Sequence, residues 1–166
     1  PISQMIPSIR RLYVGGESVA AEVVEIIEPH LSEQRPSEGG FHLVYGATEG
    51  FPLCHASAST IIGTKHQTSS GMGVCVGREV GDVQLRILPF EEAGDTKDTT
   101  DMVSGTPTSQ FSIGEISVNG PVVHSRLVGG DEEEFGGALS WAFDKNDGTY
   151  WHRTGDLGYR DKEGRI

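Results

Sequence analysis

Two strand-like runs in the N-terminal part of the chain flank a helical pattern. Residues 9–14 and 41–45 are short runs of apolar, aromatic and β-branched side chains, and glycines follow both. Residues 17–28 lie between them and repeat apolar side chains at helical spacing. A strand, a helix and a strand in this order predict a βαβ unit, with two parallel strands and a right-handed crossover.

The predicted helix has a defined start and end. Ser18 is a suitable N-cap because its hydroxyl can accept a hydrogen bond from the first turn. Pro29 should end the helix near Glu28 because proline has no backbone N–H to donate. The side chains expected on the buried face are Val19, Val23, Ile26 and Ile27.

The remainder of the chain predicts a mostly antiparallel β architecture. Short apolar runs predict strands at residues 83–87, 113–119, 150–153 and 157–160, with Thr154-Gly-Asp156 as the turn between the last two. We expect these strands to form a sandwich or a distorted, β-barrel-like subdomain.

Three other segments complete the prediction. Residues 131–143 predict a helix capped by Asp131. Residues 52–68 are polar and show no periodicity, and residues 91–110 predict a mobile surface insert. The expected fold class is therefore α/β plus β.

We expect two subdomains and a partial domain. Residues 1–55 would form the βαβ portion of a parallel sheet, and residues 56–166 the β-barrel-like subdomain, truncated at its end. The chain begins without Met and stops after a turn sequence at residues 161–165, which favours a piece of a larger protein.

Polar side chains follow the second predicted strand. Gly46 breaks the apolar run after Tyr45, and Thr48 and Glu49 come next. A hydroxyl and a carboxylate just beyond the carboxyl end of a buried strand are well placed to bind a ligand in an α/β sheet. An ordinary strand followed by a polar turn explains the same residues.

Composition excludes several classes of partner. The net charge of −11 disfavours nucleic acid, which requires clustered Lys and Arg, and no apolar run is long enough to cross a membrane. Cys54 and Cys75 do not form a metal-binding pair, and we interpret both as reduced, buried thiols of a cytoplasmic protein. His55 and His66 could line a pocket, but their spacing does not mark them as metal ligands.

Four motifs follow one another along the chain, and together they indicate a family. They are Leu12-Tyr-Val-Gly-Gly-Glu17, Tyr45-Gly-Ala-Thr-Glu49, Gly114-Glu-Ile-Ser-Val-Asn-Gly120 and Trp151-His-Arg-Thr-Gly-Asp156. In this order they resemble the core motifs of the adenylate-forming (AMP-binding) superfamily, which includes acyl-CoA synthetases, nonribosomal adenylation domains and luciferases. Together with Gly71-Met-Gly-Val-Cys-Val-Gly-Arg78 they look most similar to the branch of olefin β-lactone synthetases and fatty acyl-CoA ligases.

The resemblance implies a site for the nucleoside of ATP or AMP. The backbone at Gly15, Gly16 and Glu17 would border the adenine, where the absence of a Cβ permits close approach. Tyr45, followed by Gly46, would stack its ring on the base. A strand-to-helix turn and a core aromatic residue are the structural alternatives for the same positions.

The resemblance also implies roles at the phosphates and the ribose. Thr48 would hydrogen-bond the α-phosphate, and Glu49 would hold Mg²⁺ through a hard carboxylate oxygen; both are the expected catalytic residues. Asp156 would accept hydrogen bonds from the ribose hydroxyls, although it could instead be a turn residue. Arg78 and Glu115 we interpret as structural.

The implied function is that of a ligase. The whole enzyme would activate a fatty or β-hydroxy fatty acid as acyl-AMP with release of pyrophosphate, followed by CoA thioester or β-lactone formation. The family's upstream phosphate loop and C-terminal lid are not found in this sequence, so we expect the chain alone to be inactive and to self-associate through exposed apolar surface. The alternative is a non-catalytic, β-rich ligand-binding or partner-binding domain.

Overall fold

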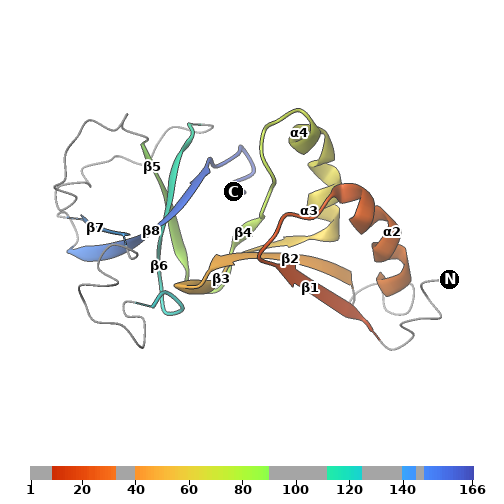
Figure 1. Ribbon diagram of the computed structural model, residues 1–166, viewed down its shortest axis with the longest axis horizontal. Coiled ribbons are helices and arrows are strands. Elements are labelled where there is room, and N and C mark those ends of the chain that lie inside the picture. Colours follow the sequence, from red (N-terminus) through yellow and green to blue (C-terminus); the bar gives the residue numbers. More distant parts are fainter. Residues whose placement is uncertain (1–8, 33–39, 90–111, 125–139, 145–147) are drawn as a thin grey trace. The chain divides into compact units, whose positions relative to one another are not determined.

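The computed structural model describes residues 9–32, 40–89, 112–124, 140–144 and 148–166 (Figure 1). Within these limits the chain forms two compact units. The first consists of Pro1–Gly46 and Cys54–Arg78, and the second of Ala47–Leu53 and Glu79–Ile166. The predicted insert at 91–110 and residues 131–139 of the predicted C-terminal helix lie outside the described residues.

The first sheet has the strand order β1-β2-β3-β4. Its elements, with the helices that connect them, are β1 (Arg11–Gly15), α2 (Ala21–Ser32), β2 (Gly40–Ala47), β3 (Gly50–Ser57), α3 (Ala58–Gly63), α4 (Lys65–Ser69) and β4 (Arg78–Glu79). β1 and β2 are parallel, with Gly15 opposite Val44. The parallel strand pair predicted for the βαβ unit is thus confirmed.

Helix α2 differs from the prediction in its start, its end and its buried face. It begins at Ala21 and passes through Pro29 to Ser32. Val23 and Ile26 are 44% and 59% exposed, so half of the predicted face is wrong, whereas Val19 and Ile27 pack against the core as predicted. The buried side chains of α2 are Ala21, Val24 and Leu31. Leu31 lies beyond the predicted end of the helix. The prediction therefore did not include it with Ala21 and Val24 as part of one buried face.

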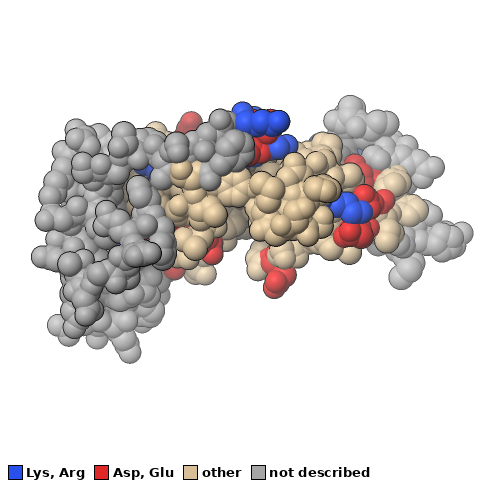
Figure 2. Space-filling view, turned by 90° about the horizontal axis from the view of Figure 1, so that it is seen from above, with Lys and Arg blue, Asp and Glu red and all other residues tan. Residues whose placement is uncertain are grey.

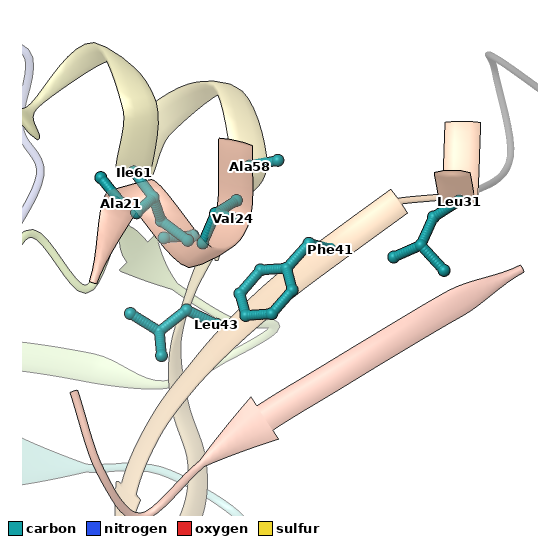
Figure 3. Packing of buried hydrophobic residues seen from close by; sticks show 8 residues of the cluster. Ala21, Val24, Leu31, Phe41, Leu43, Ala58 and Ile61 are labelled. Carbon is teal, nitrogen blue, oxygen red and sulfur yellow. The ribbon is translucent and has the colours of Figure 1, made fainter. Parts of the chain in front are cut away.

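The core of the first unit joins α2, β2 and α3. Figure 3 shows Val24 of α2 and Ile61 of α3 on the same side of β2 as Phe41 and Leu43. Phe41 is 2% exposed and Val24 is fully buried. Burial of apolar side chains at roughly 25 cal/mol per Å² is what holds helices on a sheet.

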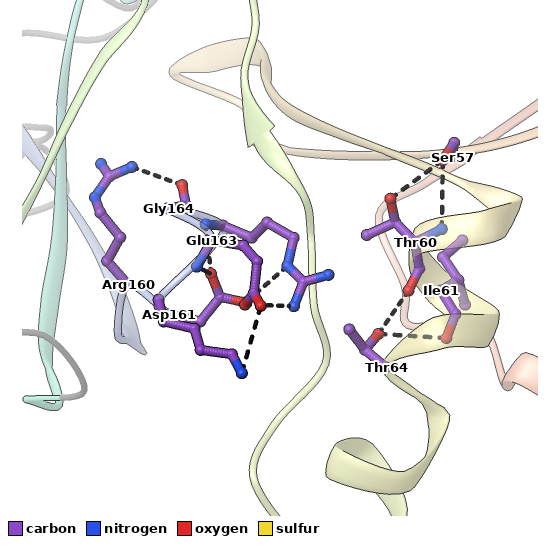
Figure 4. A network of polar contacts seen from close by, with 10 residues as sticks. Ser57, Thr60, Ile61, Thr64, Arg160, Asp161, Glu163 and Gly164 are labelled. Atoms are coloured by element: carbon purple, nitrogen blue, oxygen red, sulfur yellow. Dashed lines mark hydrogen bonds and ion pairs between the residues drawn. The ribbon is translucent and has the colours of Figure 1, made fainter.

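Residues 50–69 contain β3, α3 and α4, none of which was predicted. Pro52 in the interior of β3 argues against a strand in sequence-based reasoning, because proline cannot donate to a ladder. Ser57 ends β3 and caps α3 by accepting a hydrogen bond from Thr60 N at 3.4 Å. Thr64 closes α3 by donating from Oγ1 to the carbonyl of Thr60 at 2.9 Å (Figure 4).

The second sheet is antiparallel, with the order β5-β6-β8-β7. Its strands are β5 (Gln84–Pro89), β6 (Gly114–Asn119), β7 (Ser140–Asp144) and β8 (Thr149–Gly158). In the part of the chain that the structure describes, this sheet is open and does not close into a barrel. The antiparallel prediction is confirmed, and the barrel-like detail is not.

Two predictions in the second unit are wrong. β7 occupies residues 140–143 of the helix predicted at 131–143. β8 is one strand of 10 residues rather than two strands joined by a turn, since Thr154-Gly-Asp156 forms an irregularity within it. The core beneath these strands includes the buried Trp151, and the Arg86 guanidinium lies 3.9 Å from its ring centroid.

Both cysteines are free, as predicted. Cys54 in β3 is completely buried, whereas Cys75 is only half-buried, which differs from the expectation for that residue. No helix among the described residues is long and apolar enough to span a bilayer.

Candidate functional site

The carboxyl edge of β1 and β2 holds the first group of predicted site residues. Gly15 is opposite Val44, so Gly16 and Tyr45 follow directly at the same edge of the sheet. Gly16 has φ +83°, a conformation that favours glycine, and Tyr45 is half-buried. The fold therefore brings the Gly15-Gly16 turn together with Tyr45, while Glu17 is exposed.

A pair of histidines lies on adjacent strands of the same sheet. His42 Nδ1 and His55 Nε2 are 2.8 Å apart, and the Tyr13 ring stacks on His42 with centroids separated by 4.6 Å. Burial lowers the pKa of His42, and the nearby His55 and Arg11 act in the same direction. His55 thus contacts another histidine, whereas His66 is exposed on α4.

Thr48 and Glu49 form the turn between β2 and β3, and this turn belongs to the second unit. β2 continues through Gly46 to Ala47, so Gly46 does not end the strand as expected. The carbonyl of Glu49 accepts a hydrogen bond from His124 N at 2.6 Å, and Gly50 bridges to Val123. The segment that follows β6 therefore holds the turn in place.

The carboxylate of Glu49 reaches β8. Its Oε2 lies 3.9 Å from Nε2 of His152, a side chain that is only 3% exposed. Burial lowers the pKa of His152, although the carboxylates of Glu49 and Glu115 oppose this effect. Burial therefore favours the neutral form of the His152 imidazole. Sequence reasoning missed His152 because the contact depends on how the turn docks against β8.

Asp156 lies on an irregular segment of β8. The register between β6 and β8 shifts so that Glu115 is opposite Leu157 and Ser117 is opposite Arg153. Thr154, Gly155 and Asp156 therefore lie opposite Ile116 alone, which is a β-bulge. Asp156 is exposed at this bulge.

The residues of the bulge are held by polar contacts. Thr154 Oγ1 donates to the carbonyl of Ile116 at 3.0 Å and accepts from Asp156 N at 3.2 Å. Glu115 Oε1 accepts from Gly155 N at 3.2 Å, and Glu115 also forms an ion pair with Arg153. Gly155 and Arg153 are therefore specific partners of Glu115, which agrees with its interpretation as a structural residue. Arg78 is exposed at the start of β4.

The structure places the predicted site residues in two groups. Gly15, Gly16 and Tyr45 belong to the first unit, and Glu49 and Asp156 to the second. The described residues contain no cluster of at least 3 His, Cys, Asp or Glu side chains that could hold a metal ion.

Comparisons with known proteins agree with the motifs. No protein-family model matches the chain. The olefin beta-lactone synthetase of Xanthomonas campestris pv. campestris is 28% identical over 163 residues, which are 98% of this chain and 28% of that protein. The chain therefore spans little more than a quarter of the length of this curated relative.

Solved structures share the fold. A long-chain-fatty-acid-CoA ligase from Archaeoglobus fulgidus superimposes with a TM-score of 0.63 at 21% identity, covering 94% of this chain and 27% of the ligase. The chain has the fold of part of an adenylate-forming domain. A nonribosomal peptide synthetase protein with adenylation and PCP domains matches with the same TM-score of 0.63 at 17% identity, again over 94% of this chain and 27% of the other. The resemblance of the motifs to the adenylate-forming superfamily is confirmed.

Proposed function

We propose that this chain is part of an ATP-dependent acid ligase that forms an acyl adenylate and releases pyrophosphate. One observation carries the proposal. The turn with Thr48 and Glu49 contacts β8 through His152, and the bulge that presents Asp156 lies on that same strand. Phosphate-binding and ribose-binding groups of a nucleotide site would then be supplied by a single compact unit.

Glu49 is the residue that would hold Mg²⁺. Magnesium usually takes one or two protein carboxylates and completes its coordination with phosphate oxygens and water. A single half-buried carboxylate, with no described cluster of further protein ligands, fits that pattern. The ion would neutralise charge on the phosphates, and the Thr48 hydroxyl would donate a hydrogen bond to the α-phosphate.

The other predicted residues would contact the nucleoside. The Gly15-Gly16 turn and Glu17 would border the adenine, and Tyr45, beside Gly46, would stack on it. Asp156 would accept hydrogen bonds from the ribose hydroxyls, because an ionised carboxylate is purely an acceptor. With the nucleotide held, the substrate carboxylate would attack the α-phosphate, and positioning would supply much of the rate enhancement.

The substrate we infer is a fatty or β-hydroxy fatty acid, in a soluble, cytoplasmic enzyme. The name of the ligase from Archaeoglobus fulgidus supports a fatty acid, and the name of the relative from Xanthomonas campestris supports β-lactone formation. The adenylate would then react either with the thiol of CoA or with the substrate's own β-hydroxyl. We further propose that this chain alone is inactive, and that adenylation needs the additional length that the relatives possess.

Acid-dependent pyrophosphate release tests the proposal. The longest reading frame that contains this chain should release pyrophosphate with fatty or β-hydroxy fatty acids, and Glu49→Gln should abolish the release. Product analysis with and without CoA then separates thioester from β-lactone formation. Adenylation by the isolated 166-residue chain would contradict the need for additional length.

A non-catalytic, β-rich binding domain is the competing function. It would be favoured if the longest reading frame released no pyrophosphate with any acid while the chain still bound a ligand or partner. Nothing in the described geometry favours it over the ligase.

A further inference from the structure

The bulge in β8 is a built feature and not a frayed strand end. Gly155 has φ +78°, and a Cβ added there would meet no atom within 4 Å. Glycine is therefore required for its backbone conformation rather than for space. Regular ladder bonds resume on both sides, at Arg153 and at Leu157.

Glu115 on β6 uses both of its carboxylate oxygens to hold this bulge. Oε2 accepts a hydrogen bond from Arg153 Nε at 2.8 Å and also contacts Arg153 Nη2, while Oε1 accepts from Gly155 N at 3.2 Å. The carboxylate thus connects the residue before the bulge to the backbone within it. The side chains of Arg153 and Glu115 are only 21% and 15% exposed, so water competes weakly for these hydrogen bonds.

We propose that Glu115 and Arg153 are positioning residues for Asp156. The guanidinium fixes the plane of the Glu115 carboxylate, the carboxylate fixes the Gly155 N–H, and the next peptide unit sets the direction of Asp156. Thr154 supports the bulge from its other side by donating to Ile116. This inference rests on the proposed function, in which Asp156 binds the ribose.

The arrangement also manages charge. Asp156 and Glu115 are both acidic and contact the same short segment of β8. Arg153 compensates the charge of Glu115 through the ion pair between the two side chains. Loss of the Arg153 guanidinium would leave the Glu115 carboxylate poorly hydrated and without a compensating charge. The bulge would then have to rearrange to expose this carboxylate to water.

Ribose discrimination is the readout that a merely structural role would not move. Dissociation constants for AMP and for 2′,3′-dideoxy-AMP would be measured on the whole chain by NMR titration. Wild type should prefer AMP, and Asp156→Asn should remove the preference. The preference for AMP is the dissociation constant of dideoxy-AMP divided by that of AMP. Glu115→Gln and Arg153→Lys should lower this preference roughly tenfold, the value of a hydrogen bond to a charged group. Both variants should leave dideoxy-AMP binding unchanged.

A second ion pair in the same unit provides a matched control. Arg160 donates to Glu79 at 2.5 Å and to the carbonyls of Leu85 and Gly164 at 3.1 and 3.0 Å, and Glu79→Gln should leave the AMP preference intact. The amide resonance of Gly155 should shift in Glu115→Gln and not in Glu79→Gln, which tests the positioning contact without any ligand.

The outcomes separate the two proposals. If wild type binds no AMP or shows no ribose preference, the role of Asp156 and with it this inference are overturned. If Asp156→Asn loses the preference while the folded Glu115→Gln and Arg153→Lys variants keep it, the inference alone is overturned. An unchanged Gly155 resonance in Glu115→Gln also overturns it.

Discussion

Single glycines show how closely the backbone of the first unit is packed. Gly77 has φ +88°, and a Cβ built on it would lie 1.8 Å from the carbonyl oxygen of His55. Gly73 has nearly the same conformation, φ +87°, but open space around it. The two positions therefore separate the cost of backbone conformation from the cost of steric overlap.

We predict that Gly77→Ala is more destabilising than Gly73→Ala. The conformation should cost roughly 1–2 kcal/mol at either position, and overpacking should add about 1–3 kcal/mol at Gly77 alone. Urea denaturation of the two variants measures the difference. Equal losses of stability would show that His55 and its strand can move aside.

The turn at the C-terminal end predicts a dependence on pH. Asp161 Oδ1 accepts from the backbone N–H groups of Glu163 and Arg165 at 2.9 and 2.8 Å, and its Oδ2 accepts from the Arg165 guanidinium at 2.7 Å (Figure 4). Burial acts to raise the pKa of Asp161, but the hydrogen bonds from Arg165 and Glu163 outweigh it and lower that pKa.

Since the folded-state pKa lies below the unfolded value of about 3.9, the stabilisation is complete above that pH and is lost as pH falls through the folded pKa. Asp161→Asn should therefore be less stable than wild type at pH 7, and the difference should shrink toward pH 3. Denaturant titrations at both pH values measure it. A difference that does not change with pH would contradict the assigned role of the carboxylate.

Residue types and their order suggested the candidate site residues but not the contacts that hold them. Thr48 and Glu49 were recognisable as a polar tip beyond a strand, and Asp156 through its motif. The contacts of His152 and Glu115 were not, because they join β8 to the turn after β2 and to β6, which are distant in sequence. Local patterns contain no information on which side chains such pairings bring together.

Among the elements, α2 illustrates tertiary packing that overrides a local signal. Pro29 lies inside the helix, yet Leu31 beyond it is 2% exposed and anchors the last turn. Glu28, one residue earlier, accepts a hydrogen bond from Phe41 N at 2.6 Å, which ties the end of α2 to the start of β2. Burial and this contact offset the hydrogen bond that the proline cannot make.

Pro29→Ala should stabilise the first unit. The substitution restores a backbone donor and removes the ring from an exposed position of the helix, and we expect a gain of about 1–2 kcal/mol after allowing for the more flexible unfolded chain. Urea midpoints at constant m-value measure the gain. Loss of stability would mean that the proline fixes a bend on which Leu31 depends.

Strands were predictable where no proline or turn-like residues interrupt the apolar pattern of the strand. β5 and β6 were found because apolar side chains are grouped or alternate and glycine or proline follows. β3 was missed because Pro52 obscures it, and β8 was divided because Thr154-Gly-Asp156 resembles a turn. In β8 the turn-like residues form the bulge, so the error fell on a candidate functional feature.

At the scale of the whole molecule, the charge of −11 is the most evident property. On the face shown in Figure 2, basic side chains of the described residues lie beside acidic ones. Lys65, for example, lies 2.8 Å from Glu25 and 3.2 Å from Glu22. Exposed pairs of this kind contribute little to stability, and the acidic excess keeps copies of the chain apart at low ionic strength.

Exposed apolar side chains act in the opposite direction. Val23 and Ile26 lie three positions apart on α2 and are 44% and 59% exposed, so they form neighbouring parts of one helix face. We expect the chain to self-associate through such surface and to do so more strongly as salt screens the acidic charge.

Ile26→Lys should weaken the association because it adds a charge within the apolar face. Gln67→Lys, which adds the same charge at an exposed polar position of α4, should lower association only to the extent that net charge matters. Sedimentation velocity over a range of protein and salt concentrations measures both variants, and a chain that stays monomeric throughout would contradict the expectation.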